Sequence, residues 1–295
     1  MKPAPFEYFS PTTVDEALAH LAEYGYEAKV LAGGQSLIPM MNFRLARPSV
    51  IIDINKIKDL FFIRKNQVQG GLHIGAMARH GLVERDPLVA DLAPLIFEAM
   101  PHIATIQVRT RGTFGGSIAH ADPSAELAAV SVALDGSFLL RNQRGERWVP
   151  AQDFFVGLFT SVLEADELLI EAKFPPLSGR TGCALLEVAR RTHDFALVGV
   201  AAVVTLNEDG RCQRARLVFF SVGDGPVAAR QAVQMLENED LTPESMRVAA
   251  ETAARLDIDP GSDIHASAEY RRHLARSLSY RALEKAYNRA RGDGR

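Results

Sequence analysis

Two diglycine segments, Gly33-Gly34 and Gly115-Gly116, constrain the fold of this 295-residue chain more than any other feature. Glycine adopts backbone bends that other residues resist, so paired glycines mark places where the chain turns sharply or another group approaches it closely. The N–H groups of such a bend are able to converge on one anion. A tight turn explains a single diglycine equally well, but two of them beside hydroxyl residues favour a site for a pair of phosphate groups.

The first diglycine lies between a predicted strand over 28–32 and a helical pattern over 37–43. A helix that begins at Val14 and a β-branched strand over 50–54 complete a β-α-β unit. In this order of elements we expect the loop N–H groups, the Ser36 hydroxyl and the start of the following helix to converge on the same anion.

The second diglycine falls in residues 105–126, the least regular stretch of the sequence. Thr113 and Ser117 flank the glycines, so we expect this loop to grip the same phosphate pair from the opposite side. Asp122 is either a ribose ligand or a helix N-cap. We expect Gly115→Val to abolish retention of the bound ligand and to leave the chain folded, because a Cβ there would block the close approach of backbone to phosphate.

The remaining pattern mixes strands and helices, which indicates the α+β class. A helix over 87–99 precedes the irregular stretch, and an amphipathic helix over 268–291 places Tyr270 and Leu274 on its apolar side. Its arginines are expected on the solvent side: Arg271, Arg272, Arg276 and Arg281. Strands are expected at 60–64, 68–74, 138–140, 147–149, 168–174, 183–189 and 214–222, with an apolar run over 195–206.

Composition excludes several classes of protein. The 33 basic and 36 acidic residues give a formal net charge of −3, without the positive balance typical of nucleic-acid binders. Cys183 and Cys212 are the only cysteines, too few for a Cys-ligated iron–sulfur cluster or a structural zinc site. The sequence contains no GxGxxG, P-loop, HExxH or GxSxG motif, so we expect neither a catalytic constellation nor a metal site in this chain.

The first residues of the chain lack the apolar segment of a signal peptide. The longest apolar run, over 195–206, is shorter than the roughly 20 residues that cross a bilayer. We therefore expect a cytoplasmic protein without a membrane span.

Three segments together resemble a known family: AGGQSL at 32–37, GTFGGSIAHADPSAE at 112–126 and ARRTHDFALVGVA at 189–201. They are similar to the FAD-binding medium subunit of the molybdenum hydroxylases, the carbon monoxide dehydrogenase and xanthine dehydrogenase family. The resemblance covers essentially the whole chain. It implies a two-lobed FAD-binding domain of the PCMH type, similar to that of vanillyl-alcohol oxidase. A C-terminal α+β domain with a three- or four-stranded antiparallel sheet and helices would follow.

The resemblance also implies boundaries between these parts. The FAD-binding domain would occupy residues 1–176, with lobes of about 1–56 and 57–176. The C-terminal domain, of the carbon monoxide dehydrogenase flavoprotein type, would occupy 177–295. Residues 175–179, Pro-Pro-Leu-Ser-Gly, are the best candidate for a linker.

In this family the two diglycine segments hold the FAD diphosphate. Glu126 matches the acidic residue that contacts the adenosine part, and Leu163 matches an aliphatic residue that packs on the flavin ring. Phe195 matches an aromatic residue near the isoalloxazine, and as Phe it lacks the hydroxyl that a Tyr would offer there. The residues implied for the diphosphate are Ala32, Gly33, Gly34, Gln35, Ser36, Leu37, Thr113, Phe114, Gly115, Gly116 and Ser117.

The function implied by the resemblance is that of an electron-transfer subunit. The chain would accept electrons from the [2Fe–2S] clusters of a small partner subunit and pass them through FAD to an external acceptor. A large partner subunit would carry the molybdenum cofactor, and the whole would be a dimer of heterotrimers. Two alternatives remain open: a self-sufficient FAD-dependent reductase or oxidase of the same fold, and a non-catalytic scaffold that binds an adenine nucleotide.

Overall fold

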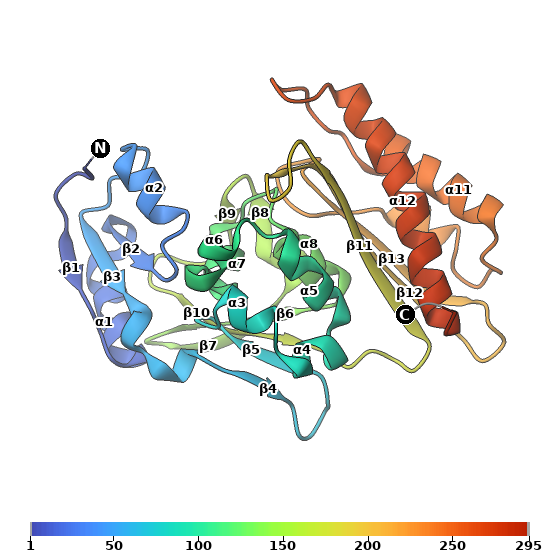
Figure 1. Ribbon diagram of the computed structural model, residues 1–295. Helices are drawn as coiled ribbons and strands as arrows, with labels where there is room; N and C mark the ends of the chain where they lie inside the picture. The colour runs from blue at the N-terminus through green and yellow to red at the C-terminus, as the bar shows by residue number, and fades with distance from the viewer. Residues whose placement is uncertain (1, 294–295) are drawn as a thin grey trace.

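The computed structural model describes residues 2–293 and contains three main sheets (Figure 1). The N-terminal lobe is built on a parallel sheet in the order β1-β3-β2. Its strands are β1 (Glu7–Phe9), β2 (Ala28–Leu31) and β3 (Val50–Asp53), with helices α1 (Val14–Tyr24) and α2 (Leu37–Asn42) between them. The predicted β-α-β unit is thus present. Because β2 and β3 are parallel neighbours, their carboxyl ends lie at the same edge of the sheet.

The middle lobe is built on an antiparallel sheet of five strands in the order β4-β5-β10-β6-β7. The strands are β4 (Ile63–Lys65), β5 (Leu72–Gly75), β6 (Ser137–Asn142), β7 (Gly145–Pro150) and β10 (Leu168–Phe174). A separate two-stranded antiparallel ribbon is formed by β8 (Phe155–Gly157) and β9 (Thr160–Ser161). Further helices of this lobe are α3 (His80–Val83), α8 (Glu126–Ala133) and α9 (Ala151–Phe154).

Two expectations for the middle lobe are wrong. The single helix expected over 87–99 is two helices, α4 (Pro87–Leu92) and α5 (Pro94–Ala99), because Pro94 begins a new helix and Ala93 lies outside helical geometry. The stretch expected to be irregular contains α6 (Ile106–Arg111) and α7 (Phe114–His120). The second diglycine therefore lies inside the first turn of a helix and not in a loop.

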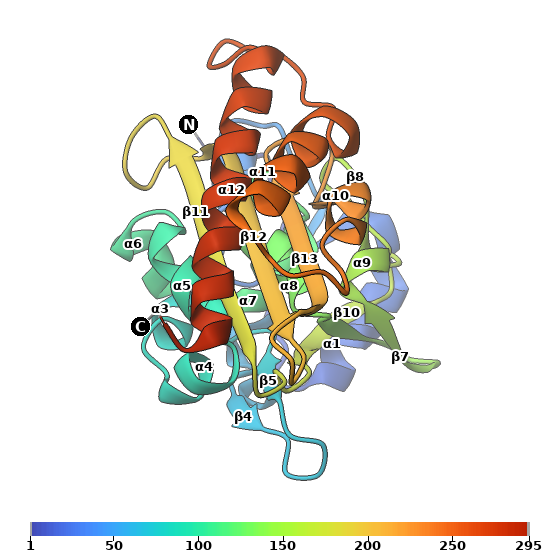
Figure 2. The same ribbon diagram turned by 90° about the vertical axis from the view of Figure 1, so that its right-hand side faces the viewer.

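The C-terminal domain contains the antiparallel sheet β11-β12-β13-β14, which confirms the expected α+β class and has four strands. Its strands are β11 (Thr181–Ala189), β12 (Ala196–Leu206), β13 (Cys212–Phe220) and β14 (Val227–Ala228). Helices α10 (Arg230–Gln234), α11 (Pro243–Thr252) and α12 (Ala268–Arg291) complete the domain. Figure 2 shows α12 and α11 lying over one face of this sheet.

The expectation for the last helix is partly wrong. Arg271 is buried, and it donates hydrogen bonds to the Leu197 carbonyl and, at 2.7 Å, to Asp263. Tyr270, expected on the apolar side, is exposed. Leu274 and the residues one turn apart along the same face are buried against the sheet as expected.

The other face of the four-stranded sheet packs on the middle lobe. Buried residues of β11 and β13, among them Leu185 and Phe220, belong to the same apolar core as Phe114 and Phe138 of the middle lobe. Salt bridges from Lys285 and Arg289 of α12 to Glu98 of α5 lie beside this core. The middle lobe and the C-terminal domain are therefore packed through a shared core, with the N-terminal lobe on the far side of the middle lobe (Figure 1).

No helix within residues 2–293 is both long enough and apolar enough to cross a bilayer. Over the same residues, no three His, Cys, Asp or Glu side chains come together as metal ligands would.

Candidate functional site

The first diglycine segment connects β2 to α2 and presents a row of unused backbone donors. The N–H groups of Gly33, Gly34, Gln35 and Ser36 donate to no acceptor in the part of the chain that the structure describes. Gly34 has a φ of 73°, a left-handed conformation that favours glycine. The Gln35 side-chain amide donates to the Gly33 carbonyl at 3.0 Å and so braces the turn. Backbone N–H groups without partners are costly unless water or a ligand accepts from them.

The second diglycine segment differs, because its backbone donors are already engaged. Phe114 and Gly115 donate to the carbonyls of Ala78 and Ala76, each at 2.9 Å. Gly116 donates to the Thr113 hydroxyl at 3.2 Å, and Ser117 donates to the Thr113 carbonyl at 3.1 Å. The expectation that both segments repeat the same chemistry is therefore wrong for the N–H groups. What the second segment offers is the bare surface of Gly116 and the half-buried Ser117 side chain.

The reason given for the Gly115→Val prediction is also wrong. A Cβ on Gly115 would lie 2.6 Å from the Cβ of Ala76 and 2.7 Å from its Cα, so the protein's own backbone occupies the space. Gly115 is buried, and Phe114 beside it packs edge-to-face on Phe174 in the core. Substitution of Gly115 would disturb the folded lobe itself.

The structure brings the two diglycine segments together although about eighty residues separate them. A Cβ on Gly33 would lie 2.5 Å from the carbonyl oxygen of Arg111, and a Cβ on Gly116 would lie 3.5 Å from the Cβ of Ala32. The absence of side chains at these glycines is what allows the contact.

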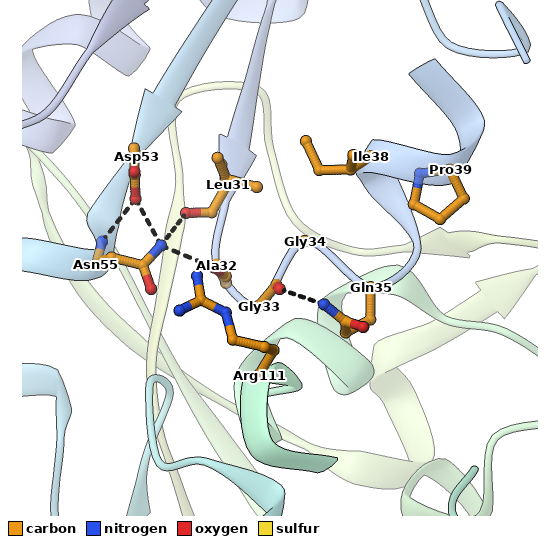
Figure 3. Close-up of a pocket in the computed structure, with 10 residues that line it drawn as sticks. All are labelled: Leu31, Ala32, Gly33, Gly34, Gln35, Ile38, Pro39, Asp53, Asn55 and Arg111. Atoms are coloured by element: carbon orange, nitrogen blue, oxygen red, sulfur yellow. Dashed lines mark hydrogen bonds between the residues drawn. The ribbon is translucent and has the colours of Figure 1, made fainter. Parts of the chain in front are cut away.

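A cavity of about 360 Å³ opens beside the first segment (Figure 3). Figure 3 shows Asp53 and Asn55 at one end, Ile38 and Pro39 of α2 at the other, and the Arg111 side chain rising from α6 between them. The lining residues are Leu31, Ala32, Gly33, Gly34, Gln35, Ile38, Pro39, Asp53, Asn55 and Arg111.

The two arginines of α6, Arg109 and Arg111, have different surroundings in the structure, although the sequence leaves their roles open. Arg109 is buried and pairs with both carboxylate oxygens of Glu84, at 2.9 and 3.2 Å, and it also donates to the carbonyls of Ile103 and Ala104. Its role is structural. Arg111 is exposed, lines the cavity and pairs with no carboxylate of the described residues. A positive side chain beside four unused N–H groups makes this cavity suitable for an anion.

Asp53 and Asn55 were not expected at the site. Burial opposes ionisation of Asp53, but hydrogen bonds from the Tyr8 hydroxyl and from Asn55 outweigh it and lower the pKa of this carboxyl. The sequence held a usable signal, because both residues follow the predicted strand over 50–54, whose carboxyl end lies at the same edge as the first diglycine.

Glu126 is the first residue of α8, six residues after the last helical residue of α7, and it is only 9% exposed. Burial raises the pKa of its carboxyl to about 8, and the neighbouring charge of Glu187 adds to this shift. Glu187 itself pairs with His102 at 3.1 Å across the junction of the two domains. A buried carboxylic acid that keeps its proton at neutral pH is able to donate a hydrogen bond.

Leu163 and Phe195 lie away from the diglycine cavity. Leu163 follows β9 and packs against the shared core. Phe195 lies in the turn between β11 and β12 and is 66% exposed. The His120 ring lies beside that of Phe159 in the β8–β9 turn, with centroids 5.2 Å apart and the planes tilted by 40°. Neither Leu163 nor Phe195 lines the cavity described above.

Comparison with protein families gives two matches. Residues 4–177 match the FAD binding domain in molybdopterin dehydrogenase, and residues 184–286 match the CO dehydrogenase flavoprotein C-terminal domain.

Individual relatives match over nearly the full length of both chains. The chain is 39% identical over 291 residues to the 6-hydroxypseudooxynicotine dehydrogenase complex subunit alpha of Paenarthrobacter nicotinovorans, covering 99% of this chain and 97% of the relative. It is also 39% identical over 291 residues to caffeine dehydrogenase subunit beta of Pseudomonas sp. strain CBB1, covering 98% and 97%. Among solved structures, the carbon monoxide dehydrogenase from Hydrogenophaga pseudoflava superposes with a TM-score of 0.94 at 37% identity, covering 98% of this chain and 99% of the other.

Proposed function

Since the chain belongs to the FAD-binding medium subunits of the molybdopterin dehydrogenase family, we propose that it holds FAD with the diphosphate against the N–H groups of Gly33 to Ser36. As an oxidoreductase subunit of this family, the protein acts within a multi-subunit dehydrogenase. The four backbone donors without an acceptor are the observation that carries the proposal. Arg111 supplies a positive charge beside them.

The residues present fit an FAD diphosphate. Gly33 and Gly34 carry no side chain that would fill the space in front of the donors, and Gly116 presents a bare surface beside Ala32. Ser117 would add a hydroxyl from the second segment. The other expected residues would contribute through their position: Ala32, Gln35 and Leu37 in the first segment, and Thr113, Phe114 and Gly115 in the fold of the second.

The remaining contacts follow from the same family pattern. Glu126, protonated at neutral pH, would donate a hydrogen bond toward the adenosine part of the cofactor. Leu163 would pack on the flavin ring, and the exposed Phe195 would cover it from the C-terminal domain. The expected boundaries, with an FAD-binding domain over 1–176 and a C-terminal domain over 177–295, would place these contacts on both domains.

Bound FAD exchanges electrons singly or in pairs, which suits a junction between one-electron carriers and a terminal acceptor. We propose that the chain accepts electrons from [2Fe–2S] clusters of a small partner subunit and delivers them to an external acceptor. The two cysteines support this division of labour, because Cys183 and Cys212 are too few to hold a cluster and both are buried, with pKa values raised by burial to about 12 and about 11. A large partner subunit would carry the molybdenum cofactor, in a dimer of heterotrimers.

The test compares the full chain alone with the chain assembled with its partner subunits. The visible spectrum of each preparation reports bound oxidised flavin, and its absence from the full chain and from the assembly would contradict the proposal. Caffeine, 6-hydroxypseudooxynicotine and carbon monoxide, the compounds in the names of the relatives, serve as probes of flavin bleaching. We expect bleaching only in the assembly; bleaching of the lone chain would support a self-sufficient flavoenzyme instead.

A further inference from the structure

We propose that Asn55 and Arg79 are positioning residues that hold the two diglycine segments in the arrangement that FAD requires. This inference rests on the proposed function and adds two residues to it. Neither residue is part of a diglycine segment, and Arg79 does not line the cavity. Their role follows from a series of four hydrogen bonds, of which the bond from Arg79 to Asn55 connects the middle lobe to the N-terminal lobe.

Asn55 controls the first segment. It lies in the short 3-10 helix Ile54–Lys56 that follows β3. Its side-chain Nδ2 donates to the Ala32 carbonyl at 2.8 Å and to Asp53 Oδ1 at 2.6 Å, and its own backbone N–H donates to Asp53 Oδ1 at 2.9 Å. The Asn55 side chain is thus fixed by Asp53 and in turn fixes Ala32.

The bond to Ala32 determines the direction of one of the four unused donors. The Ala32 carbonyl and the Gly33 N–H belong to the same peptide group, which is planar, and in the trans form they point in opposite directions. A donor held against the Ala32 carbonyl therefore aims the Gly33 N–H away from Asn55. The same hydrogen bond polarises the peptide group and makes its N–H a stronger donor.

Arg79 controls the second segment. It precedes α3 and forms an isolated antiparallel bridge with Thr113. Its Nη1 donates to the Arg111 carbonyl at 2.6 Å, and its Nη2 donates to Asn55 Oδ1 at 2.5 Å. The Arg111 carbonyl that Arg79 holds is the group against which Gly33 packs.

The bond between Asn55 and Arg79 therefore links the Ala32 carbonyl to the Arg111 carbonyl through two side chains. Each residue grips the backbone beside one segment, and their mutual bond sets the separation of the two. It also fixes the backbone from which the Arg111 side chain enters the cavity. Because hydrogen bonds to a phosphate weaken when their donors are displaced, a change in that separation would weaken contacts to the diphosphate without removing any contacting group.

The experiment measures FAD affinity of the full chain by fluorescence titration after removal of flavin, at a temperature where every variant is folded. The variants are Asn55→Ala, Arg79→Met, the double variant and Arg79→Lys. Asn142→Ala is the matched control, since the Asn142 side-chain oxygen accepts from the backbone N–H groups of Arg144 and Gly145 in the β6–β7 turn, and Asn142 does not line the cavity. Thermal unfolding of each flavin-free variant is recorded in parallel.

We expect Asn55→Ala and Arg79→Met each to weaken FAD binding about tenfold, the effect of losing a well-placed hydrogen-bonded contact. The fold-loss of FAD affinity in the double variant should be smaller than the product of the fold-losses in the two single variants, because both substitutions remove the same Arg79–Asn55 bond. Arg79→Lys, which keeps donors and charge, should recover part of the affinity, and Asn142→Ala should bind FAD as the wild type does.

A purely structural role would lower the unfolding temperature of the variants and leave FAD affinity of the folded protein unchanged, which would overturn this inference. Fully multiplicative losses in the double variant would also overturn it. Failure of the wild-type chain to bind FAD would overturn the proposed function and this inference together. The outcomes are distinguishable, because the first two require that the wild-type chain binds FAD, whereas in the third it does not.

Discussion

Gly33 packs directly against the carbonyl oxygen of Arg111, so closely that a Cβ on Gly33 would lie 2.5 Å from that oxygen. This contact joins the first diglycine segment, in the N-terminal lobe, to the end of α6 in the middle lobe, a few residues before the second segment. It gives the first glycine a role that a tight turn alone would not require, since the contact constrains tertiary structure as well as the local bend.

Gly33→Ala is expected to force the two segments apart, because the obstacle is backbone and not a flexible side chain. We predict a loss of FAD affinity of at least about tenfold, with a destabilisation of about 1–3 kcal/mol typical of an overpacked contact. Fluorescence titration and urea unfolding measure the two effects. Gly179→Ala is the matched control, because nothing lies within 4 Å of its Cβ position. Unchanged FAD affinity in Gly33→Ala would show that the segments need not touch.

Arg111→Gln removes the positive charge from the cavity and leaves the four backbone donors in place. We expect FAD binding to weaken about tenfold and to become less sensitive to salt, because salt screens a charge–phosphate attraction more than a neutral hydrogen bond. Titrations at low and high ionic strength measure both effects. Arg281→Gln, an equal change of net charge on the exposed face of α12, is the control. If the FAD affinity of Arg111→Gln and that of the wild type depended equally on salt, Arg111 would not contact the diphosphate.

Arg109→Met tests the structural role given to the other arginine of α6. It leaves Glu84 without its partner and two backbone carbonyls without a donor, so we expect a loss of about 3 kcal/mol in the free energy of unfolding. Arg247→Met is the control, since it breaks an exposed pair with Glu244 whose contribution should be below about 1 kcal/mol. Similar losses in the free energy of unfolding of the two variants, measured by urea unfolding, would contradict the structural role given to Arg109.

Glu126→Gln tests the protonation of the buried carboxyl. Its pKa is about 8 in the folded protein against an ordinary value of 4.5, so the folded state binds more protons than the unfolded state between these pH values. The stability that this proton uptake provides is complete below about pH 4.5 and is lost as pH rises toward 8.

The glutamine does not titrate, so Glu126→Gln should gain stability relative to wild type as pH rises from 5 to 8, by up to about 1.4 kcal/mol per pH unit. Urea unfolding of the flavin-free protein at several pH values measures the difference, with Glu208→Gln in an exposed turn as the control. A difference for Glu126→Gln that does not vary with pH would show that the carboxyl is ionised in the folded state.

The sequence alone predicted the α+β class, most of the strands and the bounds of the last helix, because apolar periodicity and turn residues are local signals. Prediction from sequence failed where tertiary contacts determine whether a residue is buried or helical. Arg271 follows a solvent-facing pattern, yet it is buried because the Leu197 carbonyl and Asp263 satisfy its guanidinium. The second diglycine looks like a loop, yet it is helical because Thr113 caps the helix and the backbone of Ala76 and Ala78 accepts its first donors.

The candidate site was predictable to a similar extent. Both diglycine segments are visible as motifs, but which of them keeps unused donors depends on contacts with residues far away in the sequence. The same holds for Arg79, whose two hydrogen bonds reach residues 24 and 32 positions away. No local pattern distinguishes it from the other arginines.

The central claim is that the first diglycine segment binds the diphosphate of FAD, and titration of the flavin-free full chain with FAD and with FMN tests it most directly. FMN carries the same flavin ring but has one phosphate and no adenosine. We predict one FAD bound per chain and FMN bound at least about a hundredfold more weakly, since FMN lacks the group that the four donors and Arg111 would hold. Equal affinity for FAD and FMN, or binding of neither, would contradict the account.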